Sequence, residues 1–167
     1  MKKYTDGVMY IYGDILSPYK GGDGYVVVCN QVNCQGDMVS GLSLRIKREF
    51  PGVFDVYKEK CDAANDKHDL LGDIQGASCL DEAGFVILNL FGQETFGQGV
   101  SEGKCYTDYA AIEGGFKQIA AAFRRVTIRI PYLMGCTSDG GCWQTVMQLI
   151  TDCLVAKGVP VEIWESI

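Results

Sequence analysis

The chain has 167 residues, of which 47% are hydrophobic and 22% charged, a composition typical of a globular protein with one sizeable core. The net charge of −6 and the pI of about 4.7 exclude the broad basic surface that binding to nucleic acid or to anionic membranes requires. A small anionic ligand is not excluded, because backbone amides can bind phosphate without any lysine.

Short apolar runs alternate with amphipathic stretches along the whole chain. The run at 25–29 is continuously apolar, which is typical of a strand buried on both faces. Thr107 is a suitable N-cap for a helix over 108–123. Pro51 ends the helix expected at 42–50. In chain order we expect strands at 8–12, 25–29, 70–75, 84–90, 126–131 and 161–164, and helices at 42–50, 53–61, 108–123 and 143–155.

This alternation predicts an α/β protein whose mostly parallel sheet is covered by helices on both faces. We find no internal repeat, low-complexity tract or linker, and four prolines leave little room for a domain boundary. We therefore expect a single domain over residues 1–167.

The cysteine and histidine content bears on location and on metal binding. The eight cysteines have no CxxC spacing, and His68 is the only histidine, so neither a disulfide framework nor a zinc site is expected. No apolar stretch reaches the ~18 residues of a membrane span, and glycines and aspartates interrupt any signal peptide after Met1. We predict a cytoplasmic protein with reduced thiols and without a metal or cofactor.

Two glycine-rich loops each lie between an apolar run and a helix-like segment. The first loop, 33–41, follows the run at 25–29, and the second loop, 135–141, follows the run at 126–130. A strand that ends in glycines and opens a helix presents unpaired N–H groups at the positive end of the helix dipole. Ligands of parallel sheets bind at the carboxyl ends of the strands. We therefore expect the two loops to converge on one crevice that holds a phosphate or diphosphate.

Several common signatures are absent from the sequence. It contains no GxxxxGK[ST] motif, no GxGxxG after the first strand and no GxSxG elbow. No cysteine has an arginine six positions later, which excludes a cysteine phosphatase loop. A single histidine argues against a Ser-His-Asp triad.

Four motifs occur in order over nearly the whole chain: GDIL at 13–16, VNCQGDMVSGL at 32–42, NLFGQ at 89–93, and IPYLMGC at 130–136 followed by Trp143. Together they resemble the motifs of a macro domain, the ADP-ribose-binding module. The resemblance is strongest to the branch with terminal ADP-ribose protein glycohydrolase, the ALC-one macro domain and yeast-type ADP-ribose-1″-phosphate phosphatases. It implies a three-layer α/β/α fold with a mixed, mostly parallel central sheet.

The resemblance also implies roles for individual residues. Asp14 would accept a hydrogen bond from the adenine amino group, Ile15 would lie beside the ring, and Asn33 would lie by the distal ribose. Asp139 matches a catalytic loop aspartate and would act with Asn33 to position or activate water or to stabilise an oxocarbenium-like ribose. The residues expected to cradle the diphosphate are Val39, Ser40, Gly41, Leu42, Gly135, Cys136, Thr137, Ser138, Asp139 and Gly140.

Three positions depart from the pattern of the resemblance. Val39 stands where a loop glycine is usual, and Thr137 replaces a glycine of the GCG motif. Gln93 lies near the position of the catalytic lysine of the glycohydrolases, and no lysine is close to it in sequence. This argues against a lysine-dependent mechanism.

The candidate site residues also have simpler explanations. Asp14 could end a strand in a Gly-Asp turn, Asn33 could be a turn former, and Asp139 could be a solvated residue of a Ser-Asp-Gly-Gly turn. Cys136 and Cys142 flank the second loop and could form a redox pair or remain unperturbed thiols.

Two functions are consistent with these patterns. The first is hydrolysis of an ADP-ribose derivative, either ADP-ribose-1″-phosphate or an ADP-ribosyl ester, with ADP-ribosylated protein as a potential partner. The second is a non-catalytic reader of ADP-ribose or a related nucleotide. The lack of histidine and lysine near the expected site favours the reader, whereas a small stand-alone chain favours the hydrolase, since a reader usually needs something to recruit, and we expect the hydrolase.

Overall fold

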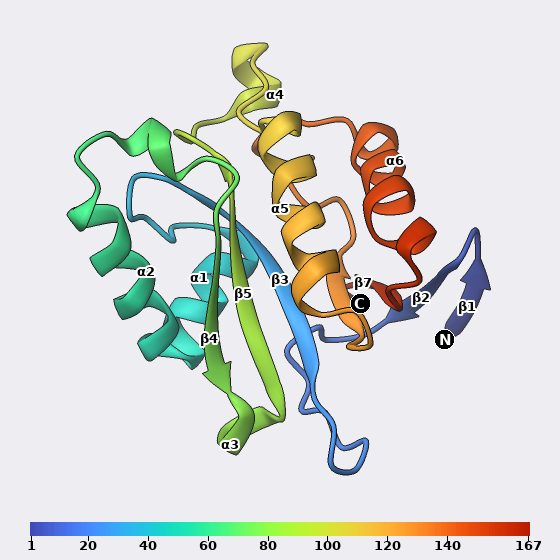
Figure 1. The fold of residues 1–167 in the computed structure, drawn as a ribbon. Helices are drawn as coiled ribbons and strands as arrows, with labels where there is room; N and C mark the ends of the chain where they lie inside the picture. The colour runs from blue at the N-terminus through green and yellow to red at the C-terminus, as the bar shows by residue number, and fades with distance from the viewer.

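A seven-stranded mixed sheet forms the centre of the computed structural model, which describes residues 1–167 (Figure 1). The strand order is β1-β2-β7-β6-β3-β5-β4, and all neighbours are parallel except the outermost pairs β1–β2 and β4–β5. The strands are β1 (Lys2–Thr5), β2 (Val8–Tyr12), β3 (Val26–Asn33), β4 (Ile74–Cys79), β5 (Phe85–Gln93), β6 (Ile128–Pro131) and β7 (Val161–Glu165).

Helices cover both faces of the sheet, so the predicted three-layer α/β/α fold is confirmed. Helices α1 (Gly41–Glu49) and α2 (Pro51–Ala63) pack on one face, and α5 (Tyr109–Ala122) and α6 (Trp143–Cys153) on the other. The short helices are η1 (Lys67–Leu70), α3 (Leu80–Ala83), α4 (Gly99–Glu102) and η2 (Val155–Lys157). None of the helices is long and apolar enough to cross a membrane.

The apolar run of β3 explains the two cores. Alternate side chains of a strand point to opposite faces, so Val26 and Val28 join the cluster under α1 and α2. Val27 and Cys29 join the cluster under α5 and α6. Each cluster holds a comparable number of buried residues, 17 and 18, and β3 therefore must be apolar on both sides.

The register of the inner strands brings three loops together. Strands β3 and β5 pair in parallel from Val26 opposite Phe85 to Val32 opposite Phe91 and then shift by one residue before Asn33. β6 pairs in parallel with β3 on its other side. The segments that follow β3, β5 and β6 therefore leave the sheet at the same edge.

The structure differs from the sequence-based expectation at several places, and β3 runs on to Asn33 where a strand at 25–29 was expected. The strand predicted at 70–75 lies instead at Ile74–Cys79, and a 3₁₀ turn precedes it. β1 was not predicted, because its mostly exposed residues give no apolar pattern. Helix α5 is capped by Asp108, whose carboxylate accepts the Ala111 N–H at 2.9 Å, and not by Thr107.

Candidate functional site

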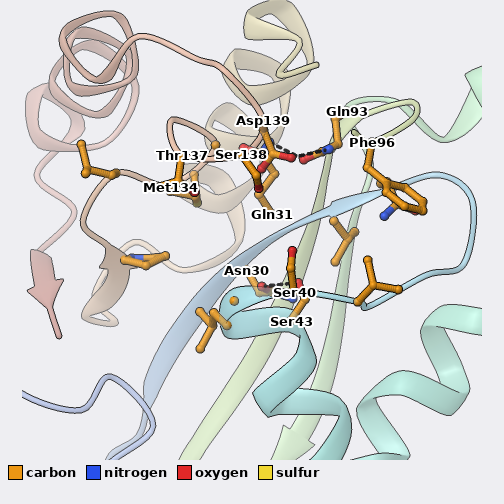
Figure 2. Close-up of a pocket in the computed structure, with 18 of the residues that line it drawn as sticks. Asn30, Gln31, Ser40, Ser43, Gln93, Phe96, Met134, Thr137, Ser138 and Asp139 are labelled. Atoms are coloured by element: carbon orange, nitrogen blue, oxygen red, sulfur yellow. Dashed lines mark hydrogen bonds between the residues drawn. The ribbon is translucent and has the colours of Figure 1, made fainter. Parts of the chain in front are cut away.

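A cavity of about 540 Å³ lies at the carboxyl ends of β3, β5 and β6 (Figure 2). Both glycine-rich loops line it, together with the segment after β5. The predicted site residues in its wall are Asn33, Val39, Ser40, Gly41, Leu42, Gly135, Thr137, Ser138 and Asp139.

The first loop is held in shape by Asn33. Its Oδ1 accepts the Gln35 N–H at 2.9 Å and the Tyr57 hydroxyl at 2.9 Å, and its Nδ2 donates to the Asp37 carbonyl at 2.8 Å. Tyr57 is a fully buried residue of α2, and its hydroxyl is also 2.8 Å from the Asn33 carbonyl oxygen. An amide nitrogen has two hydrogens. Asn33 therefore keeps one N–H for a ligand, and its Oδ1 accepts the Gln35 N–H and competes with its own main-chain carbonyl for the single hydrogen of the Tyr57 hydroxyl.

Helix α1 starts at the end of the first loop with its N–H groups uncapped. The Ser40 side chain makes no capping hydrogen bond, and the first turn contains no acidic residue. The first N–H groups of a helix have no intrahelical partner, and the helix dipole makes this end positive. The start of α1 at Gly41 is thus a main-chain site for an anion in the cavity wall.

The second loop has a constrained backbone. Leu133 has a φ of +60°, which is unusual for a residue with a side chain. At Gly135, which has a φ of +71°, a Cβ atom would lie 2.4 Å from Oε1 of Gln31 and 2.6 Å from Oγ1 of Thr107. Two hydrogen bonds close the turns of this loop: the Cys136 N–H donates to the Leu133 carbonyl, and the Gly140 N–H donates to the Thr137 carbonyl. These turns leave the N–H groups of residues 137–139 for a ligand.

The segment around α4 is bonded to the second loop. The Gly99 N–H donates to the Ser138 carbonyl at 2.6 Å, and the Tyr106 N–H donates to the Asp139 carbonyl at 2.7 Å. These bonds fix the backbone on both sides of the Asp139 side chain. Phe96, at the start of this segment, lies on the cavity wall in Figure 2.

A chain of hydrogen bonds orients the Asp139 carboxylate. Gln93, buried at the end of β5, donates from Nε2 to Asp139 Oδ1 at 2.9 Å and to the Thr95 carbonyl at 3.0 Å. Its Oε1 accepts from Gln31 Nε2 at 2.8 Å, and Gln31 Nε2 is also 2.9 Å from Oγ1 of Thr107. Asp139 Oδ2 has no protein partner, so it is the oxygen that a ligand or water can reach.

A second polar group lies deeper, beside the start of α1. Asn30 donates to Asn89 Oδ1 at 3.1 Å and accepts from the Ser43 hydroxyl at 3.1 Å, as Figure 2 shows for Asn30 and Ser43. Asn30 and Ser43 line the cavity, whereas Asn89 is fully buried with an unpartnered Nδ2. This group makes the cavity floor polar.

Four predicted site residues lie outside the cavity wall. Cys136 and Gly140 belong to the internal turns of the second loop. Ile15 is buried in the core under α1 and α2. Asp14 is half-exposed, and both of its oxygens pair with the guanidinium of Arg45, at 2.9 and 3.1 Å.

The Asp14–Arg45 pair shifts the titration of the aspartate. The hydrogen bond from Arg45 holds the pKa of Asp14 below its ordinary value of 3.8, against a smaller opposing effect of burial. A lowered folded-state pKa stabilises the protein above the unfolded-state pKa, and this contribution is lost as the pH falls through the folded-state pKa. Because both side chains are about half exposed, the contribution stays within about 1 kcal/mol.

We therefore expect Arg45→Leu to raise the Asp14 pKa toward 3.8, measured by NMR titration of the side-chain carboxyl. The difference in unfolding free energy between wild type and variant should be present at pH 7 and shrink below about pH 4. Glu49→Gln is the control, since it removes the other partner of Arg45 and leaves Asp14 paired. An unchanged Asp14 pKa in Arg45→Leu contradicts the assignment.

The charged residues of the cavity wall are both acidic: Asp37 and Asp139. No group of three or more His, Cys, Asp or Glu side chains is placed to hold a metal ion. Binding of an anionic ligand at this site would therefore depend on main-chain N–H groups.

A second depression, of about 750 Å³, lies between the start of α2 and the edge strand β4. None of its lining residues belongs to the two glycine-rich loops or to the segment after β5. Parallel sheets bind ligands outside the carboxyl ends of their strands, so the cavity between the two loops is the candidate site.

Several cavity residues escaped the sequence analysis. Asn30, Gln31 and Ser43 line the cavity, and Thr107 donates to the Gly135 carbonyl at 2.7 Å. The available signal was the pair Asn30-Gln31 directly after an apolar run, since polar residues at the end of a buried strand need partners. The contacts of Thr107 depend on tertiary structure, and no sequence pattern indicates them.

Comparison with solved structures identifies the fold. A protein from Bacteroides thetaiotaomicron has a TM-score of 0.79 and 22% identity, covering 95% of this chain and 99% of that chain. A macrodomain protein from Streptomyces coelicolor has a TM-score of 0.71 and 25% identity, covering 93% and 96%. Thermosipho africanus DarTG in complex with ADP-ribose has a TM-score of 0.73 and 22% identity, covering 99% of this chain and 43% of that chain.

The chain thus has the macrodomain fold, and the resemblance inferred from its motifs is confirmed at the level of the fold. The finer branch within the macrodomains stays a prediction. No protein-family model matches the sequence, and no curated protein matches it.

Proposed function

We propose that this protein binds ADP-ribose in the cavity between the two loops and hydrolyses an ADP-ribosyl derivative there. The observation that carries the proposal is the convergence of two glycine-rich loops with unpaired N–H groups on one cavity at the carboxyl ends of parallel strands. The Thermosipho neighbour, which was solved with ADP-ribose, supports the choice of ligand. A cytoplasmic location and one-domain organisation over residues 1–167 belong to the same proposal.

The diphosphate would lie between the start of α1 and the N–H groups of residues 137–139. At one end of the ligand, adenine would lie near Asp14 and Ile15. Asp14 Oδ2 accepts one hydrogen bond, from Arg45, so it can accept another from the adenine amino group. At the other end, Asn33 would donate its remaining N–H to the distal ribose.

Hydrolysis would use Asp139. Its Oδ2 would accept a proton from water as the water oxygen bonds to C1″ of the ribose, and the bond from C1″ to the substituent would break. The departing atom would then take up a proton. Asn33 can position water or a ribose hydroxyl by donation, but it cannot take up the proton, because a neutral amide has almost no basicity in water.

A reader without catalysis is the alternative function. It is favoured by the absence of lysine, arginine and histidine from the cavity wall and by the Gln93 amide at Asp139. Without a cationic group or a general acid in the wall, nothing there stabilises or protonates the departing atom, on which negative charge develops as its bond to C1″ breaks.

Calorimetric titration with ADP-ribose is the first test, and we expect saturable binding at micromolar concentrations. Turnover is then assayed with ADP-ribose-1″-phosphate and with ADP-ribosylated protein, by measuring released phosphate and released ADP-ribose. Asp139→Ala should lower the rate by about 10²-fold or more, the usual contribution of a general base.

Three outcomes separate the alternatives. No binding at high micromolar ADP-ribose rejects both the hydrolase and the reader. Binding without turnover leaves the reader. Turnover that survives in Asp139→Ala removes Asp139 from the mechanism, and Asp152→Ala, on the exposed face of α6, is the control for an acidic residue far from the cavity.

A further inference from the structure

The cavity has an uneven distribution of charge. Asp37 and Asp139 are its only charged wall residues, and no lysine, arginine or histidine lines it. The start of α1, where no acidic residue offsets the helix dipole, supplies a positive potential on one side. Asp139 and Gln93 lie together on the opposite side in Figure 2, away from Ser40 and Ser43 at the start of α1.

Two cations beside the first loop and helix α1 are already paired. Lys58 lies behind the first loop, with its Nζ 2.6 Å from the Asp62 carboxylate. Arg45 is bonded to both Asp14 and Glu49. None of these pairs points a free positive charge at Asp139.

In the proposed pose the diphosphate occupies the N–H groups of residues 137–139, and the other groups around Asp139 do not offset its charge. Gln93 is neutral and donates its two Nε2 hydrogens to Asp139 and to a backbone carbonyl. In the adjoining segment, the Tyr106 hydroxyl donates to Glu102, which lowers the pKa of Glu102, and Lys104 lies outside the cavity wall. A second anionic group placed near Asp139 would therefore meet uncompensated repulsion, in a site only partly screened by solvent.

From this layout we propose that Asp139 makes the cavity selective for ADP-ribosyl compounds whose distal-ribose substituent is neutral or cationic, and that it rejects a phosphate at the 1″ position. This inference rests on the proposed function, because the diphosphate must lie at the start of α1 for the distal ribose to reach Asp139. The sequence suggests two reactions, hydrolysis of ADP-ribose-1″-phosphate and hydrolysis of an ADP-ribosyl ester. The proposed selectivity favours the second, in which the bond between C1″ and the substituent breaks and water supplies the hydroxyl left on C1″. Hydrolysis of a 1″-phosphate ester at phosphorus is disfavoured.

The test compares the affinities of ADP-ribose and ADP-ribose-1″-phosphate by calorimetry at low ionic strength. We expect the phosphate to bind at least about tenfold more weakly, and the gap to shrink as salt is added, because salt screens the repulsion. Equal affinities, or tighter binding of the phosphate, overturn the inference while leaving ADP-ribose binding intact. If wild type binds neither compound, the proposed function itself has failed.

Two matched variants identify the carboxylate responsible. Asp139→Asn keeps the shape of the side chain and should reduce the difference in affinity between ADP-ribose and ADP-ribose-1″-phosphate to within about threefold. Asp37→Asn removes the other carboxylate of the cavity wall and should leave most of the gap in place. A gap that closes in Asp37→Asn and persists in Asp139→Asn overturns the assignment. If Asp139→Asn does not fold, the salt dependence of the wild-type gap still decides whether the selectivity is electrostatic.

Discussion

Gly140→Ala is expected to lower the unfolding free energy by about 2–4 kcal/mol and to abolish most of the ADP-ribose affinity. Gly140 has a φ of +75°, which is strained for alanine, and its Cβ would lie 2.2 Å from the Lys104 carbonyl oxygen. That oxygen belongs to the backbone, so it cannot rotate away as a flexible side chain would. Relief requires the second loop to separate from the α4 segment, which moves the neighbouring Asp139.

The measurement is chemical denaturation together with calorimetric titration of ADP-ribose. Gly158→Ala is the matched control, since its φ of +76° is nearly the same and nothing lies within 4 Å of the added Cβ. This control should lose only about 1–2 kcal/mol from backbone strain and bind ADP-ribose normally. Equal destabilisation in the two variants would show that the contact with Lys104 contributes nothing.

Arg129→Met should have a comparably large effect, a loss of about 3–5 kcal/mol of unfolding free energy. The Arg129 side chain is 6% exposed and lies 3.6 Å from the Glu162 carboxylate. Its Nη1 donates to the carbonyls of Ile15 and Ser17, at 3.0 and 2.8 Å. Methionine cannot donate, so it leaves the carbonyls of Ile15 and Ser17, one buried and one partly buried, without this donor, and the Glu162 carboxylate keeps only the Trp164 N–H.

The same substitution should weaken ADP-ribose binding, because Arg129 holds the turn that carries Asp14 and Ile15. Burial lowers the pKa of Arg129, but an arginine stays charged in proteins, so its removal changes the net charge of the interior. Glu162→Gln is the control: it removes the negative partner and keeps both carbonyl bonds. We expect it to cost clearly less than Arg129→Met, and a larger cost would show that the ion pair dominates over the turn.

The elements that carry an internal pattern could be predicted from the sequence. The run at Val26–Cys29 and the helix starting near Asp108 depend on local periodicity and capping, and both are present. β1 could not be predicted, because it is held by backbone pairing with β2 and buries little. The strand was expected to begin at Leu70 because this residue is apolar. In the structure Leu70 belongs to a 3₁₀ turn that buries it in the core, and β4 begins only at Ile74.

The candidate site could be predicted only in part. The glycine loops are visible in the sequence because main-chain requirements select glycine. The Gln93–Asp139 bond joins residues 46 positions apart and depends on where β5 ends relative to the second loop. The Arg45–Asp14 pair depends likewise on how α1 packs beside the turn after β2. Such pairs are set by tertiary structure, and no local pattern predicts them.

The uncapped start of α1 has a consequence for how this site changes during evolution. A cradle made of peptide N–H groups imposes few demands on side-chain identity, provided that the backbone path is kept. Val39 and Thr137, at positions where the resembling motifs have glycine, both line the cavity, and neither residue removes a main-chain N–H group. The side chains of the loops can therefore change while the path of the backbone is kept. This offers a physical reason why a comparison of structures detects the shared fold although no family model matches the sequence.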